Sequence, residues 1–283
     1  MSKSIYLLMM GCITPFLFGC GHPQKSVNNQ GVNISYTDTG KGDTTLLFVH
    51  GWCLNKSYWT NQEAFFKNRY RVVAVDLPGF GESGKNRTDW TPEAFGGDID
   101  SVMSQLNLKN VVLIGHSMGG DIVLQAALHA PERVVGLVGV DNFKHVSIET
   151  AQEKSEDAMA ITEMKRQFTN AAFQLFEQTL FYETTADSIR KRILTDVANA
   201  DSVVATACLA NLASDELGPL ASYGRKLYLI NSDYTPTDTA SLKAGHIHYA
   251  IYYIHGTGHF PMIEKPDVFN RTLEALMEDL GRR

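Results

Sequence analysis

The sequence has little of what would mark several classes of protein. Cysteine occurs four times, at positions 12, 20, 53 and 208, with no Cys-x-x-Cys spacing that would suggest a metal or redox site. The formal net charge is -6 and no basic stripe stands out, which argues against nucleic acid as a partner. With 44% hydrophobic residues over 283 positions, the chain is long enough for one large core, or for a core with a smaller subdomain.

The apolar run near the N-terminus is too short to span a bilayer. Residues 5–18 are largely apolar but number only 14, and they follow Lys3, so residues 1–19 fit a signal peptide. The run ends in Leu17-Phe18-Gly19-Cys20, which resembles the bacterial lipoprotein signal box. That resemblance implies that Cys20 is lipidated and becomes the first residue of the mature chain. We therefore expect an exported protein, either a membrane-anchored lipoprotein or a periplasmic or secreted one, with residues 20–30 as a polar tether.

The cysteines that remain after the N-terminal segment are expected to be core residues. If Cys12 leaves with the signal peptide and Cys20 carries lipid, only Cys53 and Cys208 remain. Two cysteines so placed are not a disulfide framework, and we expect both to be small core residues.

The stretch around residue 117 has the pattern of a strand, a tight turn and a helix. Residues 111–114 are apolar, two of them valine and one isoleucine. Gly115-His116-Ser117-Met118-Gly119 follows, and a helical run over 121–130 stops at Pro131. In this context Gly-x-Ser-x-Gly indicates a nucleophile elbow. The serine is then forced into strained backbone geometry, and positions 115 and 119 must be small. The turn places the hydroxyl at a helix N-terminus, where backbone N–H groups can stabilise an oxyanion. Ser117 is therefore the candidate nucleophile.

Strands alternate with helices along most of the chain, which predicts an α/β fold with a mostly parallel sheet covered on both faces. We expect strands over residues 31–38, 45–49, 71–75, 111–114, 134–140, 226–231 and 249–255, and helices over 57–67, 91–106, 121–130 and 266–280. Residues 142–222 carry no convincing strand but four amphipathic runs, over 150–168, 170–181, 186–199 and 202–213. This insertion is too long for an ordinary loop. We predict a core of residues 31–141 and 223–283 with a helical cap over 142–222 that partly lines a pocket.

Four motifs together resemble the α/β-hydrolase family in its cap-domain form. They are His50-Gly51, the loop from Asp76 to Ser83, the elbow at Ser117, and Gly258-His259-Phe260. The likeness covers nearly all of residues 32–280 and implies an α/β-hydrolase fold. It also implies a catalytic triad in the order Ser, Asp or Glu, His. Haloalkane dehalogenases and epoxide hydrolases of this family carry Asp at the elbow, so the serine excludes that branch.

His259 is the candidate base. A serine hydroxyl is a poor nucleophile without an adjacent base, which here must follow the last strand. His259 follows residues 249–255 across a Gly-x-Gly turn, whereas His255 ends the strand and is expected to be packed. His116 adjoins the serine in sequence, so we expect its side chain to point away from the site. We expect His50 to shape the backbone of the oxyanion loop.

The acid of the triad should orient the imidazole and stabilise its charged form. The family usually places it just beyond the strand at 226–231, where Asp233 stands, and we favour Asp233. Asp141, at the end of the strand at 134–140, is the alternative, and Asp238 is the third candidate; each could instead be a turn-capping Asp. The resemblance further implies an oxyanion hole made by the backbone N–H groups of Trp52 and Met118.

These features together predict a serine hydrolase that cleaves the carboxylic ester of a small-molecule acyl substrate through an acyl-enzyme. Amidases, thioesterases and carbon–carbon bond hydrolases use the same triad and remain open. A receptor or binding lipoprotein with slow turnover is the alternative from another class. No metal constellation is visible, since His246 and His248 lack a carboxylate at ligand spacing, and we expect no cofactor.

Overall fold

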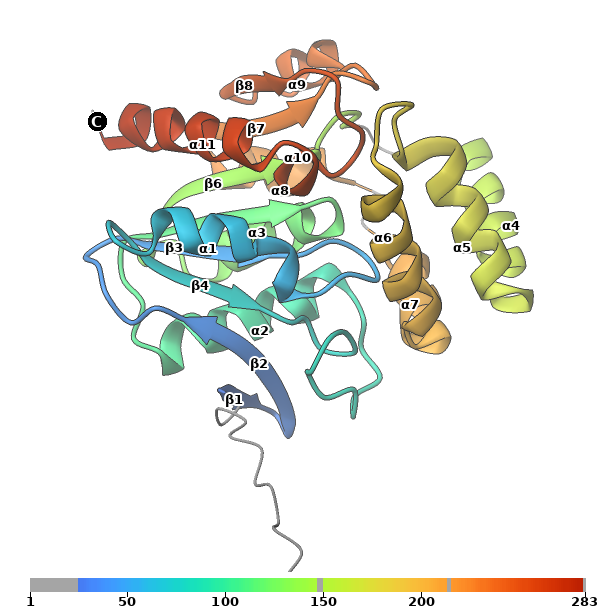
Figure 1. Ribbon diagram of the computed structural model, residues 1–283, viewed down its shortest axis with the longest axis horizontal. Coiled ribbons are helices and arrows are strands. Elements are labelled where there is room, and N and C mark those ends of the chain that lie inside the picture. The colour runs from blue at the N-terminus through green and yellow to red at the C-terminus, as the bar shows by residue number, and fades with distance from the viewer. Residues whose placement is uncertain (1–24, 147–149, 213–214, 282–283) are drawn as a thin grey trace, which may run out of the picture.

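An eight-stranded sheet forms the centre of the protein (Figure 1). The computed structural model describes residues 25–146, 150–212 and 215–281, so the expected signal peptide and Cys20 lie outside the described residues. The strand order is β1-β2-β4-β3-β5-β6-β7-β8. All neighbours from β4 to β8 are parallel, whereas β1 and β2 pair antiparallel at one edge. The strands are β1 Ser26–Asn29, β2 Val32–Asp38, β3 Thr45–Val49, β4 Arg71–Val75, β5 Val111–His116, β6 Val134–Val140, β7 Leu227–Ser232 and β8 Tyr249–Ile254.

Helices cover both faces of the sheet, which confirms the predicted α/β-hydrolase fold. On one face α2 (Pro92–Gln105), α3 (Met118–His129) and α8 (Leu217–Tyr223) pack against one another. On the other face lie α1 (Thr60–Phe66), α10 (Pro261–Glu264) and α11 (Pro266–Gly281). Every residue of the central strands β3 and β5 is buried. Covered on both sides, these strands are continuously apolar rather than alternating.

Local capping explains where two of the helices begin. Thr91 accepts a hydrogen bond from the Ala94 N–H at the start of α2, and Pro92 occupies the first turn, where its missing N–H costs nothing. The short 3₁₀ helix η1 (Lys56–Trp59), which precedes α1, is capped by Asn55. The capping side chain therefore comes two residues before the predicted helix start at 57.

The predicted cap is a group of helices beside the ends toward which the parallel strands point (Figure 1). It comprises α4 (Ala151–Arg166), α5 (Phe168–Leu175), the π-helical turn η2 (Phe176–Leu180), α6 (Asp187–Asn199) and α7 (Ser202–Ala210). Two boundaries differ from the prediction. Helix α8, expected to end the cap, packs on α3 of the core, and residues 26–29, expected in the tether, form β1. Another short helix, α9 (Thr239–Ala244), lies between β7 and β8.

Side-chain contacts fasten the cap to the core. The Tyr58 hydroxyl donates to Asp196 Oδ2 on α6 at 2.7 Å, and the Arg192 guanidinium lies 4.2 Å from the centroid of the Tyr58 ring. The Trp52 indole N–H donates to the Ala205 carbonyl on α7 at 2.8 Å. The cap is thus held at several points around the cavity that it covers.

No single helix in the described part of the chain has the length and apolarity to cross a membrane. Helices α6 and α7, bent by 97° at the break between them, meet those two criteria only as a pair.

Candidate active site

Ser117 occupies a strained turn between β5 and α3. Its φ of 52° and ψ of -128° lie in a region that side-chain-bearing residues rarely adopt. Its N–H donates to the Val140 carbonyl at 3.0 Å, and its own carbonyl accepts from the Gly120 N–H at 2.7 Å. A Cβ at Gly115 would lie 2.1 Å from the Gly119 carbonyl oxygen, so the strand and helix could not approach as they do. The predicted need for small residues beside the serine is therefore confirmed.

The histidine loop after β8 brings His259 against a carboxylate. His259 Nδ1 is 2.6 Å from Asp141 Oδ2. Because an ionised carboxylate only accepts hydrogen bonds, Nδ1 carries the hydrogen, and Nε2 of the neutral ring is left as the acceptor. The His259 N–H donates to the Leu180 carbonyl of the cap at 2.8 Å, which ties the loop to η2.

Asp141, and not Asp233, is the carboxylate that His259 contacts. Asp233 pairs with His255 Nδ1 at 2.6 Å, and these side chains are 43% and 77% exposed. The choice of Asp233 was therefore wrong for the partner of His259, and the alternative is the one the structure adopts. The expectation that His255 is packed was also wrong. Asp238 accepts from the Ala240 N–H at 2.9 Å and caps α9.

Backbone geometry explains why Asp141 reaches the histidine. Asp141 directly follows β6 with a φ of 46°, and its side chain is buried. Its Oδ1 accepts from the Ser232 N–H at 2.8 Å and from the Ser232 hydroxyl at 2.5 Å. These bonds across β6 and β7 aim Oδ2 at the imidazole.

The charge on Asp141 is held by its partners. Burial by itself would raise the pKa of Asp141, but the hydrogen bond and charge of His259, with the ammonium of Lys144, lower it to about 2. The carboxylate is consequently ionised at neutral pH.

His116 lies inside the site, contrary to expectation. Its Nε2–H donates to the His259 carbonyl at 2.7 Å, and the two rings are 4.8 Å apart between centroids. Burial, followed by the proximity of His259, lowers the pKa of His116 to about 3, so this ring is neutral. Its Nδ1 has no hydrogen-bond partner among the described residues. His116 therefore holds the backbone of the loop that carries His259 in place through this hydrogen bond.

The loop after β3 is shaped by His50, as expected. His50 Nδ1 donates to the Gly51 carbonyl at 2.8 Å, and Nε2 accepts from the Leu77 N–H at 3.0 Å. The ring is buried, and burial lowers its pKa. Trp52 follows on this loop, and Met118 is the first residue of α3, where a helix leaves its N–H groups without internal acceptors. Both residues line the same cavity as Ser117 and His259.

That cavity is the space between the core and the cap. Its volume is about 350 Å³, within the range of small-molecule sites. Core side chains form its floor, and the cap side is apolar, with Leu175, Phe176, Leu180, Leu209 and Leu212. The stacking of the Trp52 ring on Phe176, 6.0 Å between centroids, joins the two walls. Within the described residues no group of three or more His, Cys, Asp or Glu side chains is arranged to hold a metal ion.

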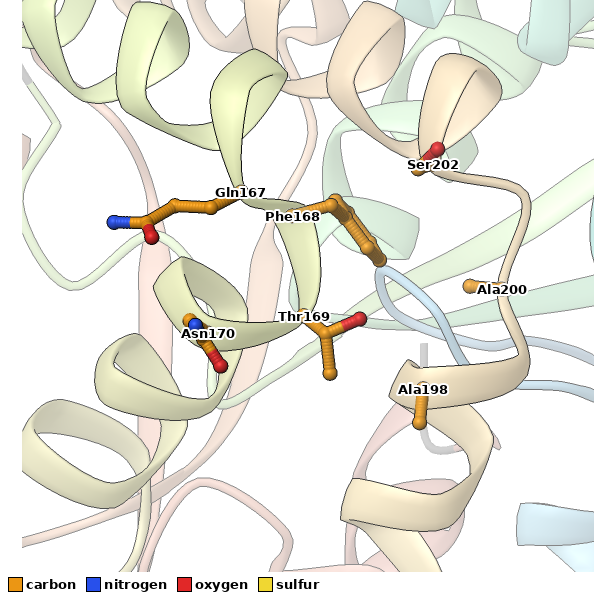
Figure 2. Close-up of a pocket in the computed structure, with 7 residues that line it drawn as sticks. All are labelled: Gln167, Phe168, Thr169, Asn170, Ala198, Ala200 and Ser202. Atoms are coloured by element: carbon orange, nitrogen blue, oxygen red, sulfur yellow. The ribbon is translucent and has the colours of Figure 1, made fainter.

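A second cavity of about 350 Å³ lies within the cap, where the α4–α5 junction faces the α6–α7 junction (Figure 2). Its wall is mostly polar or small, formed by Gln167, Phe168, Thr169, Asn170, Ala198, Ala200 and Ser202. The Phe168 ring packs edge-on against Trp52, with centroids 5.8 Å apart. Since Trp52 lines the first cavity, this aromatic pair contributes one ring to each.

Besides His116, sequence reasoning missed Lys144 and Asn142. Lys144 forms an ion pair with Asp141 Oδ1 at 2.8 Å, and Asn142 donates from Nδ2 to the Ser117 carbonyl. Both follow Asp141 closely in sequence, but no motif or spacing distinguishes them from ordinary residues of a loop. Cys53 and Cys208 are buried free thiols, as expected of core residues.

Comparison with known proteins gives a consistent pattern. The family model described as alpha/beta hydrolase fold matches residues 44–191. The uncharacterized hydrolase YugF of Bacillus subtilis is 36% identical over 112 residues, 39% of this chain and 41% of that protein. 3-oxoadipate enol-lactonase 2 of Acinetobacter baylyi is 23% identical over 270 residues, 91% of this chain and 97% of that protein. A thermophilic esterase from Thermogutta terrifontis, in a malate-bound structure, has a TM-score of 0.77 at 22% identity, covering 91% of this chain and 97% of that one.

The extent of these matches differs. The chain spans only 29% and 41% of the lengths of the first two curated relatives that it matches. The match to the Thermogutta structure is nearly complete, and at this identity it shows a shared fold.

Proposed function

Because the chain belongs to the alpha/beta hydrolase fold family, we propose that it is a serine hydrolase that cleaves carboxylic esters of small molecules. The observation that carries the proposal is the hydrogen bond between His259 Nδ1 and the buried Asp141 carboxylate. Both residues line a cavity that Ser117 also lines, and Ser117 lies in a strained turn. The Acinetobacter relative is named as an enol-lactonase, and a lactone is a cyclic carboxylic ester. The Thermogutta protein of the same fold is named as an esterase.

The proposed reaction runs through an acyl-enzyme. Ser117 Oγ attacks the ester carbonyl while His259 Nε2 takes its proton, and Asp141 stabilises the imidazolium that results. The backbone N–H groups of Trp52 and Met118 hold the negative oxygen of the tetrahedral intermediate. His259 then passes the proton to the departing alkoxide, which leaves as the alcohol. Water, deprotonated by His259, attacks the acyl carbonyl, and the proton returns to Ser117 Oγ as the carboxylic acid is released.

The test combines labelling with turnover. A fluorophosphonate probe should label the wild type and not Ser117→Ala, and p-nitrophenyl acetate should be hydrolysed only by the wild type. A panel of esters, amides and thioesters of graded acyl length then distinguishes the bond types that the triad could cleave. Labelling without turnover on any acyl compound would contradict the ester hydrolase and favour a binding protein. Absence of labelling would remove Ser117 as the nucleophile.

We also propose that the protein is exported and anchored through a lipid on Cys20. The support is the short apolar run before Leu17-Phe18-Gly19-Cys20. The intact mass of the mature protein, recovered from a bacterial membrane fraction, should begin at Cys20 with added lipid. Cleavage at another residue, or an unmodified Cys20, would contradict this.

A further inference from the structure

The carboxylate of Asp141 contacts two basic side chains rather than one. Asp141 Oδ2 faces His259 Nδ1 at 2.6 Å, and Asp141 Oδ1 faces Lys144 Nζ at 2.8 Å. One oxygen of the Asp141 carboxylate therefore contacts an imidazole while the other contacts an ammonium.

The Lys144 ammonium is fixed in its position. The side chain is 14% exposed, and Nζ also donates to the Ser232 hydroxyl at 3.1 Å. The same nitrogen lies 4.3 Å from the centroid of the Tyr234 ring, close enough for a cation–π contact. Lys144 is also part of the wall of the catalytic cavity.

Besides Lys144, the cavity lining that includes His259 carries the carboxyl of Asp121 at the start of α3, and burial raises the pKa of Asp121 to about 6. Glu264 accepts from the Gly258 and Phe260 N–H groups, both at 3.2 Å, on the same loop. The neighbouring His116 ring is neutral, and the Asp233–His255 pair lies at the surface. The η2 segment packed on the loop contributes the Leu180 carbonyl. Lys144 is therefore the cation nearest to the Asp141–His259 pair among the contacts of the described residues.

We propose that Lys144 is a positioning residue that shares the charge of Asp141 with His259 and thereby keeps the imidazole neutral, and able to act as a base, at lower pH. This inference rests on the proposed function. A positive charge on the far side of the carboxylate weakens the hold of that carboxylate on an imidazolium. The site would keep the orientation that Asp141 gives the ring while limiting how strongly the ring binds a proton.

The test is the pH profile of kcat/KM. In Lys144→Met the Asp141 carboxylate keeps its contact with His259 but loses the ammonium. The acidic limb of the profile, on which kcat/KM falls as His259 is protonated, should therefore move to higher pH by about one unit. On that limb kcat/KM, taken relative to the plateau of the same variant at higher pH, falls by up to about tenfold. Lys144→Gln, neutral but able to hydrogen-bond, should behave in the same way, and Lys144→Arg should keep the wild-type limb.

A matched control removes one positive charge elsewhere. Lys226 directly precedes β7, and Lys226→Met breaks its ion pair of 2.8 Å with Asp279 on α11, outside the cavity lining. Its acidic limb should coincide with that of the wild type. An equal shift in this control would attribute the effect to net charge and overturn the inference.

NMR titration separates this inference from the proposed function. The ring signal of His259, assigned with His259→Gln, can be followed with pH in the wild type and in Lys144→Met without any substrate. A higher midpoint in Lys144→Met supports the inference even if no ester is hydrolysed. An unmoved midpoint overturns it even if Ser117 is labelled and esters are cleaved. Loss of folding in both neutral variants, with a folded Lys144→Arg, would make the charge structural and also overturn it.

Discussion

Replacing a carboxylate with an amide tests which of the two candidate aspartates, Asp141 or Asp233, acts as the acid of the triad. In Asp141→Asn the amide can donate to His259 Nδ1 and so favour the wrong tautomer. The same exchange in a serine protease triad lowers kcat about 10⁴-fold. A 10⁴-fold loss corresponds to about 5 kcal/mol of transition-state stabilisation. We expect a loss of this order here, because Asp141 is buried and both of its oxygens are already occupied by the site.

Asp233→Asn is the matched control, with the same chemical change at the other candidate. Its contact with His255 is solvent-exposed, and even a fully charged pair at such a place contributes at most about 1 kcal/mol. We expect kcat to stay within about twofold of the wild type, since no contact joins Asp233 to His259 in the part of the chain that the structure describes. Hydrolysis of p-nitrophenyl acetate under saturating conditions measures both variants, and circular dichroism confirms that each is folded. If Asp233→Asn lost activity while Asp141→Asn kept it, the assignment of the acid would be refuted.

Three further perturbations test other parts of the argument. Phe168→Ala removes the ring beside Trp52, so the two cavities should join. The acyl chain that the enzyme prefers, measured on a panel of p-nitrophenyl esters, should then become longer. An unchanged preference would show that the cavities stay separate. The folded-state pKa of Asp141, about 2, lies below its ordinary 3.8, so its ionisation stabilises the fold by about 2 kcal/mol above pH 4. That contribution is lost as the pH falls toward 2. The free energies of unfolding in urea of the wild type and Asp141→Asn should therefore differ less at pH 2 than at pH 6. Gly115→Ala places a Cβ 2.1 Å from the Gly119 carbonyl, and expression of a folded, labelled protein would contradict the close approach at the elbow.

The elements that could be predicted are those encoded by local patterns. The buried strands read as short apolar runs, and β3, β4 and β6 have the predicted bounds. The elbow was predicted because its glycines, its serine and the flanking strand and helix are contiguous, so the steric demands act between neighbours in sequence. The cap helices were predicted by amphipathic spacing, although their ends moved by a few residues.

The errors have a common physical cause. Strand β1 is a short polar segment with no apolar pattern of its own, and it forms because β2 offers an antiparallel partner. Helix α8 was counted with the cap because it follows it in sequence, but its buried residues pack on α3. Each assignment depends on a partner far away along the chain, which local patterns do not encode.

The sequence by itself determined which reactive groups are present: a serine hydroxyl in a strained turn, a histidine after the last strand, and aspartates at the ends of two neighbouring strands. Only the tertiary structure decided which aspartate the histidine meets, since that depends on the left-handed turn at Asp141 and on hydrogen bonds from Ser232, 91 residues later. It also decided that Lys144 and His116 belong to the site. Residue type is a local property, but which side chains come within hydrogen-bond distance is set by the packing of strands that are remote in sequence.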